Sequence, residues 1–174
     1  LSILGIDPSQ PSVTRGQTEP WDVALRVANS GSASFRLDLA ELRVFVDGVD
    51  RTATYGIAVS KPLDGVLAQA SVDTLHFHIT RNGDDTGQAT LEGRVHATDL
   101  NSGTALEADT FLGGKGSVRV QSPGVLAAGR LAPSQPAVTV GQARKMQATL
   151  NLRNTGEAAL GSAANFHPIT AVDV

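Results

Sequence analysis

The sequence predicts an all-β protein: one complete immunoglobulin-like antiparallel β-sandwich followed by the first part of a second copy. Three observations predict it. A segment near the start recurs later in the chain, apolar and polar residues alternate over many short runs, and no run of ten residues has the spacing of an amphipathic helix. Short alternating runs that end in Gly, Asn, Asp and Pro clusters are typical of a β-sandwich.

The repeat has a period of 125 residues. The segment PSQPSVTRGQ at 8–17 returns as PSQPAVTVGQ at 133–142, with eight of ten positions identical. The offset continues without a gap, so that Asn29-Ser30-Gly31 aligns with Asn154-Thr155-Gly156. Self-similarity at a fixed long period indicates one structural unit that occurs twice.

The repeat divides the chain into three parts. We expect a complete sandwich at 1–121, a Ser-Pro-Gly linker at 122–124 and an incomplete second sandwich at 125–174, which holds only 50 residues of the period. A strand pair with a bare apolar face is marginal in water. We therefore expect that face to be covered by the first domain or, as the favoured alternative, by another copy of the chain in a head-to-tail filament. Its residues are Met146, Ala148, Leu150 and Leu152.

Trp21 begins a strand whose inward face can be identified. Apolar residues occupy every second position from Trp21 to Val27, which is the pattern of a half-buried strand and predicts a buried Trp21. The other inward faces are expected at Phe35, Leu37 and Leu39, at Leu42, Val44 and Val46, at Leu75, Phe77 and Ile79, at Leu91, Val95 and Ala97, and at Val118 and Val120. The change from odd to even positions predicts a β-bulge near Ala40-Glu41.

Composition excludes several classes of function. The chain carries 14 Lys and Arg against 17 Asp and Glu, and its basic residues are scattered, whereas nucleic-acid binding needs clustered positive charge. It has no cysteine and therefore no disulfide, thiolate metal site or cysteine nucleophile. No apolar run approaches the roughly 18 residues that span a bilayer. We expect neither a nucleic-acid partner nor a membrane span.

Three histidines are the candidate zinc ligands. His76 and His78 are two positions apart on one expected strand and face away from its apolar side, and His96 has the same outward register on another strand. Imidazoles in this arrangement can share a metal ion, with Glu92 as a fourth ligand. The alternative is three unrelated surface histidines, which we prefer because no cysteine or carboxylate completes the ligand spacing.

Asp99 and Asn101 are the candidate calcium ligands. They lie in Asp99-Leu100-Asn101-Ser102-Gly103, which alternates oxygen ligands before a glycine as the start of a calcium loop does. The third acidic position and the closing Glu of such a loop are missing, and turn chemistry explains the stretch without a metal. We therefore expect no bound metal and no cofactor.

The sequence contains no catalytic motif. The segment Leu112-Gly113-Gly114-Lys115-Gly116 has the glycines and lysine of a phosphate loop, but a strand pattern follows where that loop needs a helix. A Gly-x-Ser-x-Gly elbow is absent. The single Trp21 and the single Tyr55 are the broad aromatic platforms available to a sugar, and Trp21 is in register with the core. We expect the protein not to be an enzyme.

A family resemblance rests on three motifs: Val13-Thr14-x-Gly16-Gln17, Asn29-x-Gly31 and Val44-x-Val46-Asp47-Gly48. Together they resemble the CARDB family of cell-adhesion-related, immunoglobulin-like domains, over about residues 1–48 and the start of the second copy. The resemblance implies a non-catalytic structural or adhesive tandem module of an exported bacterial surface or filament protein, extracellular or at the cell surface, with other copies or surface glycans as partners. The alternative is a carbohydrate-binding or accessory module attached to a secreted enzyme.

Overall fold

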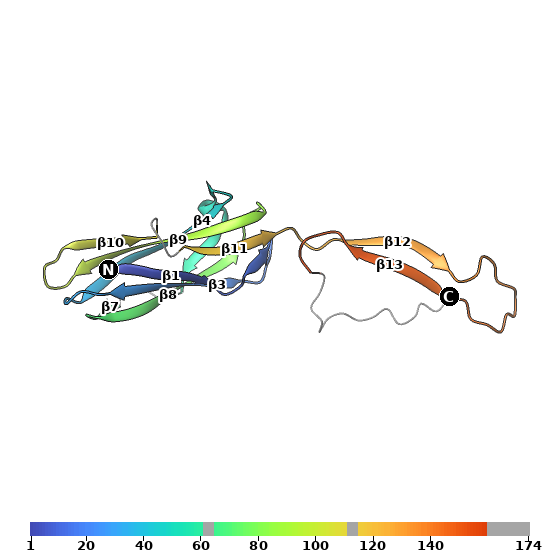
Figure 1. Ribbon diagram of the computed structural model, residues 1–174, viewed down its shortest axis with the longest axis horizontal. Helices are drawn as coiled ribbons and strands as arrows, with labels where there is room; N and C mark the ends of the chain where they lie inside the picture. The colour runs from blue at the N-terminus through green and yellow to red at the C-terminus, as the bar shows by residue number, and fades with distance from the viewer. Residues whose placement is uncertain (61–64, 111–114, 160–174) are drawn as a thin grey trace. The chain divides into compact units, whose positions relative to one another are not determined.

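The chain folds almost entirely into β-strands. The structure is a computed structural model that describes residues 1–60, 65–110 and 115–159. It divides into two compact units, Leu1–Gln121 and Ser122–Val174. Within the described residues the only helical element is a single 3₁₀ turn, Thr52–Thr54 (Figure 1). The predicted all-β class is confirmed.

Two sheets build the first unit (Figure 1). The smaller sheet is antiparallel and has the order β1 (Ser2–Pro8), β3 (Trp21–Asn29), β8 (Ser71–Arg81) and β6 (Gly56–Val59). The larger sheet has the order β2 (Ser12–Thr14), β11 (Gly116–Gln121), β9 (Gly87–Asp99), β4 (Phe35–Val46) and β5 (Val49–Asp50), with β10 (Ala105–Asp109) on β9 and β7 (Val66–Leu67) on β4. These two strand orders are those of an immunoglobulin sandwich, which confirms the predicted architecture.

The core lies between the inner faces of the two sheets. Trp21 is 2% exposed, and its indole N–H donates a hydrogen bond of 2.7 Å to the buried Asn82 Oδ1. Leu25 is fully buried, and a Cβ added at Gly93 on β9 would stand only 2.8 Å from Leu25 Cδ1. A glycine at position 93 therefore allows the two sheets to approach each other at this point. The predicted inward register of β3 is confirmed.

One predicted core residue, Leu39, is in fact at the surface. The pairing of β4 with β9 shifts register between Leu37 and Leu39, so the bulge lies before the expected Ala40-Glu41. The extra residue turns the side chain of Leu39 outward, where it is 43% exposed, and brings Ala40 into the core. Asp38 in the bulge accepts hydrogen bonds from Arg36 Nε at 2.9 Å and Thr98 Oγ1 at 2.6 Å.

The second unit contains an antiparallel hairpin of β12 (Leu126–Pro133) and β13 (Ala148–Asn154). Its pairing repeats that of β1 with β3 at the offset of 125 residues. Ile6 pairs with Leu25 as Leu131 pairs with Leu150, and both hairpins are irregular at the same place, between Ile3 and Gly5 and between Ala128 and Leu131. The repeated sequence therefore produces the same hairpin twice.

Side-chain hydrogen bonds at the ends of the two hairpins are also repeated. Asn29 accepts the Gly31 N–H at 2.9 Å and donates to the Ala33 carbonyl at 2.7 Å. Asn154 accepts the Gly156 N–H at 3.0 Å and donates to the Ala158 carbonyl at 2.9 Å. Each of these bonds joins residues two or four positions apart, so it depends on the local sequence that the two copies share.

We expect Trp21→Ala to lower the free energy of unfolding by about 3–5 kcal/mol, because it removes a buried indole and leaves Asn82 without its donor. Urea unfolding followed by circular dichroism measures it. Met146 occupies the repeat-equivalent position but is 46% exposed, so Met146→Ala is the matched control and should change stability little. Equal losses in the two variants would contradict the assigned core.

Candidate functional site

The candidate zinc ligands lie on different sheets. His76 and His78 are on β8 of the smaller sheet, and His96 is on β9 of the larger one. All three point away from the core, and the outer faces of the two sheets are opposite sides of the sandwich. His78 Nδ1 is instead 2.8 Å from Asp22 Oδ1. Over the part of the chain that is described, no three His, Asp or Glu side chains gather as metal ligands.

Glu92, the expected fourth ligand, belongs to an ion pair. Its side chain is only 10% exposed and contacts the Lys115 ammonium. The lysine thereby neutralises a carboxylate that packing on β9 has largely removed from water. Glu92 is therefore engaged with a cation of the protein itself, on the same outer face of β9 as His96.

The candidate calcium loop is the turn between β9 and β10. Asp99 Oδ1 accepts the backbone N–H groups of Asn101 at 2.8 Å and Ser102 at 2.9 Å, and Gly103 has a φ of +70°. These two N–H bonds, that of Ser102 first, lower the pKa of Asp99. The carboxylate is thus an acceptor for the turn, and Asn101 contributes its backbone rather than a ligating side chain.

The remaining sequence candidates are the glycine-rich segment and the two aromatic residues Trp21 and Tyr55. Residues 111–114 of the glycine-rich segment lie outside the described residues, and the strand β11 begins at Gly116, as expected. Trp21 is buried, and Tyr55 is only 5% exposed. Burial raises the pKa of Tyr55, with a further contribution from the charge of Asp85. Neither ring is a broadly exposed platform for a sugar.

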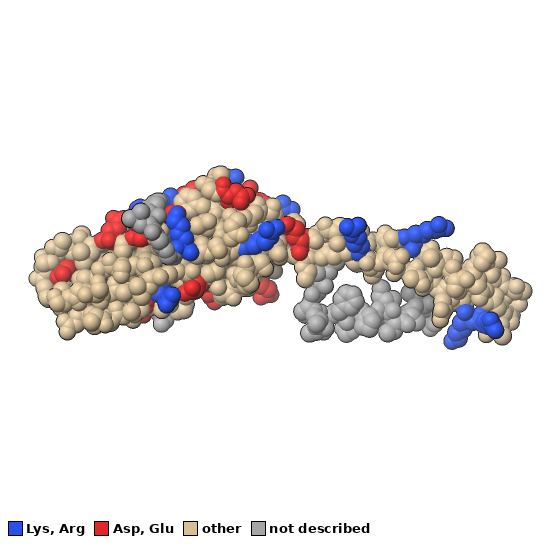
Figure 2. Space-filling model, in the orientation of Figure 1, with Lys and Arg blue, Asp and Glu red and all other residues tan. Residues whose placement is uncertain are grey.

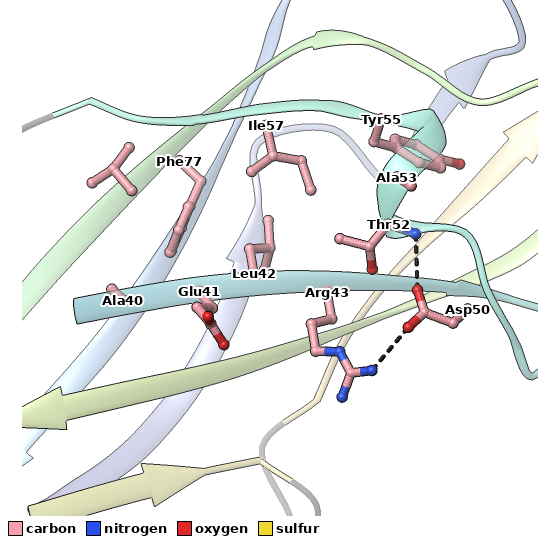
Figure 3. A pocket seen from close by; sticks show the side chains of 11 residues that line it. Ala40, Glu41, Leu42, Arg43, Asp50, Thr52, Ala53, Tyr55, Ile57 and Phe77 are labelled. Carbon is pink, nitrogen blue, oxygen red and sulfur yellow. Dashed lines mark hydrogen bonds and ion pairs between the residues drawn. The ribbon is translucent and has the colours of Figure 1, made fainter.

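A groove of about 680 Å³ opens between β4 and β6, at one side of the first sandwich (Figure 3). Its inner wall is apolar and is formed by Ala40, Leu42, Ile57, Val59 and Phe77. Its rim carries polar and charged side chains, which include Glu41, Arg43, Asp50 and Thr52. An apolar hollow with a polar rim suits an amphipathic partner, such as an alternating strand.

The groove is open because β4 lacks a full-length neighbour on this edge. Among the described residues, β7 pairs only with Phe35-Arg36 and β5 only with Phe45-Val46. Gly93, which lies opposite Leu42, bonds its own N–H and C=O to Thr110 rather than to β4. The backbone groups of Leu42 and, by alternation, of Ala40 are therefore directed toward the open edge.

Asp50 orders the rim. Its carboxylate accepts the Thr52 N–H at 3.0 Å and pairs with Arg43 at 2.8 Å (Figure 3). The bond from the Thr52 backbone is the largest influence, followed by the Thr52 side chain and Arg43, and together they lower the pKa of Asp50 to about 2. The charged rim is thus held in place beside the apolar wall.

The sequence pattern does not predict this groove. A twelve-residue strand flanked by two strands of two residues each creates it, and runs of two residues carry no periodicity that could be recognised. The nearest signal was the Asp47-Gly48 turn, which shows where β4 ends but not how much of its edge is covered.

A second candidate surface is the apolar face of β13. Leu150 is 43% exposed and Leu152 is 46% exposed, whereas the equivalent Leu25 and Val27 in the first unit are fully buried. The expected cover by another copy of the chain remains a prediction. Within the described residues β13 pairs only with β12, so its other edge also offers unpaired backbone groups.

Comparisons with known proteins give no family. No protein-family model and no curated protein matches the chain. The ASH/PapD-like domain of human CEP192 aligns at 18% identity with a TM-score of 0.38, over 70% of this chain and 87% of that one. The secreted serine protease VesC from Vibrio cholerae aligns at 18% identity with a TM-score of 0.39, over 68% of this chain and 23% of that one. The sandwich is therefore established by the strand pairing of the chain itself.

None of the helices in the described residues is long and apolar enough to cross a membrane.

The charge of Asp50 should stabilise the fold at neutral pH. A lowered pKa means that the folded state favours the ionised carboxylate, so the stabilisation is complete above the unfolded value of roughly 3.9 and is lost as pH falls through about 2. Carboxyl NMR titration should place its midpoint near 2. In Asp50→Asn the loss of stability should be present at pH 6 and disappear toward pH 2, whereas a midpoint near 3.9 would contradict the rim geometry.

Metal ions should not change the stability of the protein. Because His76, His78 and His96 do not converge and Asp99 is occupied by its turn, neither zinc, calcium nor a chelator should shift the melting temperature. Calorimetry with and without EDTA measures this. A shift of several degrees would reveal a site that the described residues do not form.

Proposed function

We propose that this chain is a non-catalytic, load-bearing module of tandem immunoglobulin-like domains in an exported bacterial surface or filament protein. The CARDB-like motifs motivate the exported, adhesive setting. The physical support comes from the hydrogen-bonded strands near the two ends of the first unit.

The strands β2 and β11, near the two ends of the first unit, run parallel and are hydrogen-bonded to each other. Arg119 pairs with Ser12 and Gln121 with Thr14. The Arg15 N–H donates to the Gln121 carbonyl at 2.9 Å, and the Arg119 N–H donates to the Pro11 carbonyl at 3.1 Å. This pairing is the single observation that carries the proposal.

Parallel terminal strands resist pulling. Tension on the two ends of the unit draws β2 and β11 past each other along their length, so all of their hydrogen bonds must break together. In an antiparallel arrangement of the same ends, the bonds would open one at a time. Each hydrogen bond contributes only about 1 kcal/mol, so one bond alone resists little. The force needed to unfold the unit is raised because all the bonds between β2 and β11 are loaded at the same time.

The repeat supports a role in which such units follow one another. The described part of the second unit has the same hairpin, the same bulge and the same turn bonds as the first. Repetition of one unit along a chain multiplies length without a new binding site. The alternative role in carbohydrate binding loses its support from Trp21 and Tyr55, because both are buried.

Single-molecule pulling on the chain tests the proposal. The first unit should unfold in one event that releases about 400 Å of chain, at roughly 3.4 Å per residue over 121 residues. Arg15→Pro should lower its unfolding force. The substitution removes the N–H that donates to the Gln121 carbonyl of β11. Proline fits the turn at 14–17, because Gly16 at the third position has a φ of +70° and such turns favour proline at the second position.

Val140→Pro is the matched control, because Val140 precedes Gly141 in the second copy of the same turn. It should leave the force of the first unit unchanged. A gradual extension without a force peak, or an equal force in Arg15→Pro and the wild type, would refute the mechanical role.

A further inference from the structure

We propose that β13 of one copy of the chain adds to the open edge of β4 in a second copy, antiparallel, with Leu150 and Leu152 in the groove between β4 and β6. This inference deepens the proposed function by naming the partner as a second copy of the chain and the surfaces through which the copies join.

The acceptor is the stretch of β4 from Asp38 to Arg43. It spans roughly 20 Å at about 3.3 Å per residue, between the segments of β4 that β7 and β5 pair. The backbone groups of Ala40 and Leu42 point toward this edge. The side chains of the same two residues are buried and form part of the apolar wall of the groove. An added strand would therefore satisfy the backbone and fill the groove at once.

The donor strand has the matching arrangement. Gln147 bonds Ser134 through its N–H at 3.1 Å and its C=O at 2.7 Å, which fixes the direction of the alternating backbone groups along β13. The backbone groups of Leu150 and Leu152 therefore point to the edge of β13 that no described residue pairs, and the apolar side chains of the same residues are exposed. Hydrogen-bonded partners in an antiparallel pair share a face, so both leucines would enter the groove.

One register sets both leucines opposite the two inward residues of the acceptor stretch. It places Leu150 opposite Leu42 and Leu152 opposite Ala40. Glu41, exposed on the outer face of β4, then lies diagonally across from Arg153. Opposite charges at this diagonal spacing attract each other.

Charge favours this pairing over pairing between two hairpins. Residues 1–121 hold ten Lys and Arg against fifteen Asp and Glu, a net charge of −5, and residues 122–174 hold four against two, a net of +2. On the face seen in Figure 2 the β12–β13 hairpin displays basic side chains, and the first unit displays both signs. A joint between the second unit of one copy and the first of the next is thus attractive, whereas two second units repel.

The joint uses a different surface on each copy. A contact of this kind leaves one copy with an unused donor strand and the other with an unused acceptor edge, so further copies add head to tail. The assembly is a ring where the rotation between copies closes and an open chain where it does not.

Engineered cysteines test the register, because the chain has no cysteine of its own. A Glu41→Cys chain is mixed with an isotope-labelled Asn151→Cys chain under mild oxidation. In the proposed register these residues form a non-hydrogen-bonded pair with Cα atoms about 4.5 Å apart, within the range of a disulfide. We expect the mixed disulfide, identified by intact mass, to form on the order of tenfold faster than between non-contacting sites.

Thr149→Cys is the matched control. Thr149 is exposed on the same face of β13 but lies two residues out of register with Glu41. Equal rates for Thr149→Cys and Asn151→Cys would overturn the register. Faster self-crosslinking of Asn151→Cys would overturn the proposal in favour of pairing between two hairpins. Circular dichroism verifies that each variant, altered only at an exposed position, keeps its strands.

Sedimentation of the unmodified chain provides an independent test. We expect the mean mass to rise with protein concentration, to fall with added salt, and to return to that of a monomer in Leu150→Glu, while the melting temperature of the first unit stays the same. A monomer at every concentration would overturn strand addition. It would leave the load-bearing role intact, because the unfolding force of the first unit is measured on a single chain.

Discussion

The architecture depends on covering the apolar face of the hairpin with which each repeat begins. In the first unit this face belongs to β1 and β3, and the larger sheet packs onto it so closely that β9 has a glycine opposite Leu25. In the second unit the same hairpin forms with the same pairing, but Leu150 and Leu152 are exposed. The two hairpins therefore share their strand pairing and turn bonds, and they differ in whether their apolar face is buried.

With the apolar faces of its two sheets buried against each other, the first sandwich has two edges that matter for the proposed roles. One pair of strands, β2 and β11, closes the unit with parallel bonds that pulling loads together. On the other side, β5 and β7 pair with the two ends of β4, and no other described residue pairs with its middle, which lies beside an apolar wall. In the roles proposed above, the first edge resists pulling and the second accepts another strand.

Much of the fold could be predicted because its patterns are short-ranged. The inward register from Trp21 to Val27 and the Asn-x-Gly turns follow from alternation and turn chemistry that one strand carries by itself. Alternation predicts the bulge too late along β4 and wrongly predicts Leu39 in the core, because apolar residues at both odd and even positions allow the extra residue at several points. The groove could not be predicted, because it depends on how much of β4 its distant neighbours cover.

The sequence by itself determined the all-β class, the repeat of 125 residues and the hairpin that begins each copy, because these arise from periodicity and from bonds between near neighbours. Tertiary structure alone decided which side chains meet. It separated His76 and His78 from His96 by assigning their strands to opposite sheets, paired Glu92 with Lys115, and left Ala40 and Leu42 at an open edge. Strand order sets such contacts, and two strands of identical pattern can occupy different positions in a sandwich.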